Sequence, residues 1–103
     1  MADSELPEST STRWARNPDV VARRIGGRTI LVPTGRGIAD HRALFTLNDA
    51  ASHVWDQLAT ARSGEQLVRS LCREFDVTPA QARRDIGIFV GEMKRRGCIL
   101  ELP

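Results

Sequence analysis

The spacing of hydrophobic residues changes once along the chain, near residue 48. Before that point the apolar runs are short and rich in β-branched residues, which is typical of strands. Gly26 and Gly27 stand between the first two runs and indicate a tight hairpin turn. Residues 34–42 carry two further glycines and mixed charge, so we expect a loop there. The predicted strands cover residues 20–25, 28–33 and 43–47.

After residue 48 the apolar positions recur every three or four residues, as they do on one face of a helix. Asn48, Ser63 and Thr78 stand where helix N-caps are expected, and Pro79 directly after Thr78 suits the first helical position. Gly97 is typical of a helix end, and residues 98–102 are expected to add a short last strand. The stripes that should face the core are Ala51, Val54, Trp55 and Leu58; Leu67, Val68, Leu71, Cys72 and Phe75; and Ala82, Ile86, Phe89, Val90 and Met93.

Three strands followed by three helices predict an α+β fold with a three-stranded antiparallel sheet. A turn at residues 76–77 would join the last two helices, which is helix-turn-helix geometry with the hairpin as its wing. Residues 1–17 are polar and rich in Ser and Thr, and this composition predicts a disordered tail that holds Trp14 loosely. The expected folded domain is a winged helix-turn-helix over residues 18–103.

Composition narrows the possible partners. A chain of 103 residues is one domain's worth of sequence, and a net charge of +2 favours neither nucleic acid nor an anionic membrane surface. No apolar run is long enough to span a membrane, and the acidic, polar N-terminus does not resemble a secretory signal. Cys72 and Cys98 are therefore expected to be free thiols, with Cys72 in the core, in a protein of the reducing cytoplasm.

The sequence shows no pattern typical of catalysis or metal binding. His41 falls in a predicted loop and His53 on the polar side of the first predicted helix, so we expect both to be satisfied or exposed side chains, with no metal and no cofactor. Gly35 and Gly37 lack the strand-to-helix context of a phosphate-binding loop. No Ser/His/Asp arrangement is visible, so the domain is not expected to be an enzyme by itself.

The helical half resembles the PqqD-like family. Its residues 46–58, TLNDAASHVWDQL, are similar to that family's pattern of Leu-Asn, a small residue, then Ile or Val followed by Trp, one variable residue and Leu. Two later groups of residues fit the family's turn and its third helix. They are Leu71, Phe75, Asp76 and Val77, and then Asp85, Ile86, Phe89, Val90, Met93 and Gly97.

The resemblance implies a recognition element that binds the leader of a ribosomally made precursor peptide. The leader would add as a strand to the third strand, beside the third helix, and be presented to a modifying enzyme of the radical-SAM or lasso type. The implied peptide-binding residues are Arg42, Ala43, Leu44, Phe45 and Thr46 on the strand, and Arg83, Arg84, Gly87, Val90, Gly91 and Lys94 on the helix. Gly87 and Gly91 share one helix face, which indicates either a shallow groove for another backbone or tight packing within the protein.

Two other functions remain open from the sequence. A winged helix that binds DNA would place Arg83 and Arg84 in the major groove, although the low net charge does not favour this. An adaptor would dock an enzyme through Trp14, the tail or the first helix, and deletion of residues 1–17 would then abolish docking. An exposed strand edge could also pair with a second copy, so a homodimer is possible.

Overall fold

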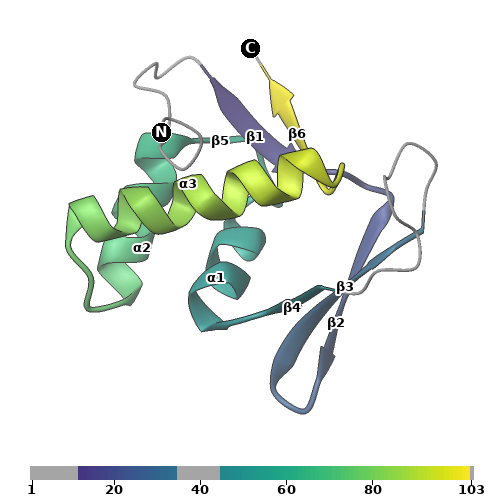
Figure 1. The fold of residues 1–103 in the computed structure, drawn as a ribbon. Coiled ribbons are helices and arrows are strands. Elements are labelled where there is room, and N and C mark those ends of the chain that lie inside the picture. Colours follow the sequence, from purple (N-terminus) through teal and green to yellow (C-terminus); the bar gives the residue numbers. More distant parts are fainter. Residues whose placement is uncertain (1–11, 35–44, 103) are drawn as a thin grey trace.

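The chain forms two small antiparallel sheets and three helices (Figure 1), and the computed structural model describes residues 12–34 and 45–102. One sheet has the order β2-β3-β4 and the other the order β5-β1-β6. Within the described residues the strands are β1 Arg13–Arg16, β2 Val20–Ile25, β3 Arg28–Pro33, β4 Phe45–Leu47, β5 Arg62–Ser63 and β6 Ile99–Leu102. The helices are α1 Asp49–Gln57, α2 Gly64–Glu74 and α3 Pro79–Arg95.

The predicted hairpin and its turn are confirmed. Strands β2 and β3 pair from Val20 opposite Pro33 to Ile25 opposite Arg28, and the hairpin projects from the body of the molecule (Figure 1). Gly26 and Gly27 have φ angles of 60° and 81°, which suit a two-residue turn with both central residues in the left-handed region. This turn fixes the register of the sheet that β4 then joins.

Replacing Gly27 by alanine should destabilise the hairpin. A Cβ atom at Gly27 meets no atom within 4 Å, so the cost is that of the positive φ alone, about 1 kcal/mol. Asparagine tolerates the left-handed region better, so Gly27→Asn should cost less than Gly27→Ala. Urea unfolding of the three proteins measures both differences. An alanine variant as stable as the wild type would contradict the turn geometry.

The predicted disordered tail is wrong from Arg13 onward. Arg13–Arg16 forms β1, the central strand of its sheet, and Trp14 on that strand is only 3% exposed. The strand pairs with β5 and β6, which lie about 50 and 85 residues further along the chain. Four residues with one large apolar side chain carry no local period, so their order comes from these distant partners. Residues 1–11 lie outside the described part of the chain.

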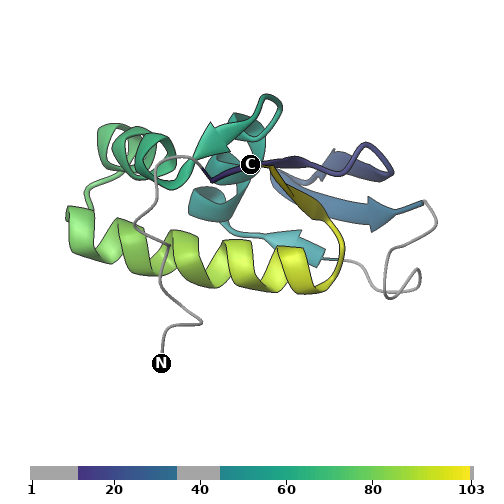
Figure 2. The same ribbon diagram turned by 90° about the horizontal axis from the view of Figure 1, so that it is seen from above.

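Helix boundaries follow the predicted caps. The side chains of Asn48, Ser63 and Thr78 each accept a hydrogen bond from the backbone N–H three positions on, and Ser63 forms a full capping box with Gln66. The chain leaves α3 and turns back at Gly97 into β6, as expected for the last strand (Figure 2). Strand β5 at Arg62–Ser63 was not predicted, because its two residues pair only with distant β1.

The core lies between the helices and the inner faces of both sheets. The predicted stripes are buried at most positions, but Cys72, which we expected in the core, is half-buried at its border. No described helix is both long enough and apolar enough to cross a membrane. The buried apolar residues are Trp14, Val20, Leu31, Leu47, Val54, Trp55, Leu58, Leu67, Val68, Leu71, Ala82, Ile86, Val90, Met93, Cys98 and Ile99.

Candidate functional site

Strand β4 is an open edge of its sheet. Its residues pair with β3 on one side, with Leu31 opposite Phe45 and Thr29 opposite Leu47. On the other side no strand of the described chain pairs with it. Unpaired backbone N–H and C=O groups along such an edge can accept a further strand. Residues 45–47 carry no proline and no charge that would oppose that pairing.

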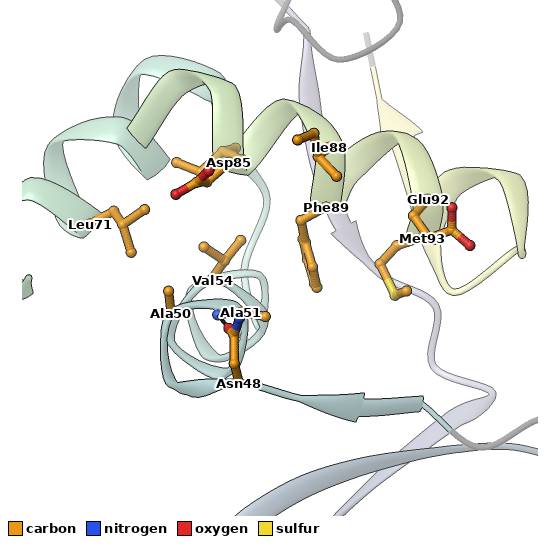
Figure 3. Close-up of a pocket in the computed structure, with 11 residues that line it drawn as sticks. Asn48, Ala50, Ala51, Val54, Leu71, Asp85, Ile88, Phe89, Glu92 and Met93 are labelled. Carbon is orange, nitrogen blue, oxygen red and sulfur yellow. Dashed lines mark hydrogen bonds between the residues drawn. The ribbon is translucent and has the colours of Figure 1, made fainter. Parts of the chain in front are cut away.

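A pocket of about 370 Å³ opens beside this edge, between α1 and α3 (Figure 3). Asn48, the residue directly after β4, is part of the pocket lining, and Phe89 and Met93 extend from α3 toward α1. Most of the lining is apolar, with carboxylates from Asp85 and Glu92. The lining residues are Asn48, Ala50, Ala51, Val54, Leu71, Asp85, Ile86, Ile88, Phe89, Glu92 and Met93.

One face of α3 forms a wall of this pocket, opposite α1 (Figure 3). Asp85, Ile88 and Phe89 recur at helical spacing and so lie on one side of the helix. Ile88 is 52% exposed, a large fraction for an isoleucine, and Phe89 is half-buried. Asp85 accepts two hydrogen bonds from Gln81 Nε2, at 3.0 and 3.2 Å, and forms no ion pair with a described residue. The wall is thus apolar with one uncompensated carboxylate.

Glu92 and Arg96 connect the end of α3 to β4. The Arg96 guanidinium lies over the Phe45 ring, 4.9 Å from its centre, and its Nε donates to Glu92 Oε2. Arg95 also pairs with Glu92, at 2.6 Å. The hydrogen bond from Arg96, and then the one from Arg95, hold the pKa of Glu92 below its ordinary value. These contacts place the charged groups of Glu92 and Arg96 next to Phe45, the first residue of β4.

Replacing Arg96 by glutamine should raise the pKa of Glu92 toward its ordinary value, because the largest stabilising contact of the carboxylate is lost. Arg95→Gln should raise it less. A lowered folded-state pKa stabilises the fold above the unfolded pKa, and that stabilisation is lost as pH falls through the folded pKa. Carboxyl NMR titration measures the pKa in each variant. An unchanged pKa in Arg96→Gln would contradict the contact.

The helix residues predicted to bind the peptide do not line this pocket. Gly87 and Val90 are buried, Arg83 pairs with Glu65 of α2 at 2.7 Å, and Lys94 pairs with Glu101 of β6. Gly91 is half-buried and Arg84 is exposed, and neither lines the pocket. These residues lie on the sides of α3 that pack on α2 and β6 or face away from the pocket, and their role in peptide binding stays a prediction.

Of the five strand residues predicted to bind the peptide, the structure describes two. Phe45 and Thr46 lie on β4, with Phe45 packed against the core and Thr46 exposed. Arg42, Ala43 and Leu44 lie outside the described residues. Asp85, Ile88 and Glu92 line the pocket but are not among the site residues predicted from the sequence. The sequence did contain an indication that Ile88 belongs to a binding surface, because it is a large apolar residue outside the buried stripe of its helix.

The described residues show no sign of a metal centre. No group of three or more His, Cys, Asp or Glu among them could hold an ion. The His53 Nε2 atom lies 2.7 Å from Ser70 Oγ, and its ring meets Phe75 edge-on, so this histidine is satisfied within the fold. His41 lies outside the described part of the chain.

The fold and the site together define a small α+β domain of antiparallel strands and three helices, with an edge strand beside a helix-walled pocket. Its sequence matches the family model "Coenzyme PQQ synthesis protein D (PqqD)" over residues 28–99. The chain belongs to the PqqD family. This match includes β3, β4, all three helices and the start of β6.

Three solved structures share the fold. "TbiB1 in Complex with the TbiA(beta) Leader Peptide" has a TM-score of 0.68 and 21% identity, over 82% of this chain and 93% of that one. "Lasso peptide synthetase B1 complexed with the leader peptide" has a TM-score of 0.68 and 23% identity, over 84% and 96%. The third is the solution NMR structure of the PqqD truncation of Methylobacterium extorquens PqqCD, described as a functional, stand-alone recognition element for ribosomally synthesized and post-translationally modified peptides. It has a TM-score of 0.70 and 18% identity, over 97% and 99%. A comparison with curated protein sequences gave no match.

Proposed function

We propose that this domain binds the leader segment of a ribosomally made precursor peptide and presents it to a peptide-modifying enzyme. The observation that carries the proposal is the open edge of β4 beside the α1–α3 pocket. Membership of the PqqD family supports it. Two proteins of the same fold are bound to leader peptides, and a third is described as a recognition element.

The leader would bind as a fourth strand next to β4. Each backbone hydrogen bond would contribute only about 0.5–1.5 kcal/mol, and ordering a free peptide costs about 2–5 kcal/mol or more. Backbone pairing with a three-residue strand therefore does not provide enough binding free energy by itself, and side-chain contacts must add to it. An apolar leader residue that enters the pocket against Ile88 and Phe89 would supply about 1.5–3 kcal/mol.

The domain would act by binding alone. Its contribution to the modification is to raise the local concentration of the precursor at the enzyme, which needs no catalytic group. We propose that the enzyme is of the radical-SAM or lasso-processing type. We also propose a cytoplasmic location, since that is where a ribosomally made precursor is first met.

Affinity capture with the tagged full chain, with and without nuclease, identifies the precursor by mass spectrometry. Its synthetic leader is then titrated into the ¹⁵N-labelled protein. We expect shifts of the backbone amides of Phe45–Leu47 and of Ile88 and Phe89, with amides of β6 unchanged. Shifts confined to β6 or to the hairpin would contradict the proposed site. Captured material that disappears with nuclease would instead indicate DNA binding.

A further inference from the structure

The outer face of the β2-β3-β4 sheet is unusually apolar. Residues directly opposite in an antiparallel pair share a face, so the register separates the sheet into two sets. The inner set contains the buried residues Val20, Thr29, Leu31 and Leu47. The outer set, which we call the outer face, consists of Val21, Arg23, Ile25, Arg28, Ile30, Val32 and Thr46.

No described segment covers this outer face. Val21 is 40% exposed and Ile25 is 58% exposed, while Ile30 and Val32 are only half-buried. The solvent side of an antiparallel sheet normally carries polar residues. Four β-branched aliphatic residues on one exposed face are instead typical of a surface that meets a partner.

The charge of the outer face is of one sign. Arg23 and Arg28 stand among the aliphatic residues, and the face has no acidic side chain. Neither arginine forms an ion pair with a described carboxylate. Arg24 points to the opposite face, where it donates to Thr29 Oγ1 at 3.0 Å. An apolar patch flanked by carboxylates is the surface that complements this arrangement.

The outer face continues into the proposed leader site. Thr46 belongs to the outer face and lies on β4, the strand that would receive the leader. A strand added to β4 extends the same sheet, so alternate leader side chains emerge on the outer face next to Thr46. A partner seated there would contact the domain and the bound leader together.

We propose that the outer face is the docking surface for the peptide-modifying enzyme, which meets it with an apolar patch bordered by Asp or Glu residues. The inference rests on the proposed function, because it is the leader strand that completes the surface. It adds a second site to the molecule, on the face opposite the core, and it gives the enzyme a means to distinguish the loaded domain from the empty one.

The test uses the full chain, the synthetic leader and the modifying enzyme purified after capture with its precursor. Two affinities are measured for each variant: leader binding by fluorescence anisotropy, and enzyme binding to the leader-loaded domain by biolayer interferometry. The variants are Arg23→Glu and Ile25→Asp on the outer face. The controls are Arg23→Lys, which keeps the charge, and Leu100→Asp on β6, where a leucine is 44% exposed away from this face.

We expect Arg23→Glu and Ile25→Asp to weaken enzyme binding about tenfold or more while leader affinity stays at the wild-type value. Both controls should bind the enzyme normally, and enzyme binding should weaken with added salt. Outer-face variants that bind the enzyme as the wild type does would overturn the inference but leave the proposed function intact. A wild-type domain that binds no leader would instead contradict the proposed function.

Discussion

Replacing Trp14 by alanine is expected to lower the free energy of unfolding by about 3–5 kcal/mol, enough to unfold a large share of a marginally stable domain. Trp14 is 3% exposed and lies on β1, between β5 and β6. Its removal would leave a cavity and weaken the strand that joins two distant parts of the chain. Urea denaturation followed by circular dichroism measures the loss.

Trp14→Phe is the matched variant, because it keeps an aromatic ring in the core and should cost clearly less than alanine. An alanine variant within about 0.5 kcal/mol of the wild type would contradict the placement of Trp14, since that is the range of surface substitutions. The position of β1 in the fold also affects how truncated proteins are interpreted. Deleting residues 1–17 removes β1, so a loss of binding would result from unfolding and would not show that the tail docks a partner. A truncation that starts at residue 12 keeps every described strand.

Replacing Ile88 by aspartate is expected to weaken leader binding by more than about tenfold. Ile88 is 52% exposed at the pocket, so the change should leave the core intact. It removes an apolar contact and adds a third carboxylate to the pocket, beside those of Asp85 and Glu92, which disfavours an apolar leader side chain. Isothermal titration calorimetry with the synthetic leader measures the affinity.

Leu100→Asp provides the matched control, because Leu100 is a similarly exposed aliphatic residue on β6, outside the pocket. It should bind the leader as the wild type does. Equal losses in both variants would indicate a general effect of added charge, and an unchanged affinity in Ile88→Asp would exclude the pocket as the anchor site.

Local signals predicted much of this fold. The caps at Asn48, Ser63 and Thr78 and the glycine pair at the hairpin each act through their own neighbours, and all are where the sequence placed them. Strand β1 could not be predicted in this way. Its order depends on pairing with residues near both the middle and the end of the chain, which no local pattern encodes.

The predicted helix residues do not line the α1–α3 pocket, and which residues bind a leader stays a prediction. Gly87 and Gly91 suggested a groove, yet Gly87 is buried, and the pocket opens on the opposite side, at Asp85 and Ile88. Helical spacing groups residues by face but does not state which face meets which neighbour. On the sides of α3 away from the pocket, Arg83 pairs with Glu65 of α2, and Lys94 pairs with Glu101 of β6.

The most direct test of strand addition is a backbone N-methylation scan of the leader, one residue at a time, with affinity as the readout. A methyl group removes one N–H donor. In an added strand, alternate N–H groups face β4. We therefore predict that methylation weakens binding at every second position of the segment that pairs with Phe45–Leu47 and has little effect at the positions between. Affinity that is unchanged throughout the scan, or that falls every third or fourth residue as for a helix, would contradict binding at the β4 edge.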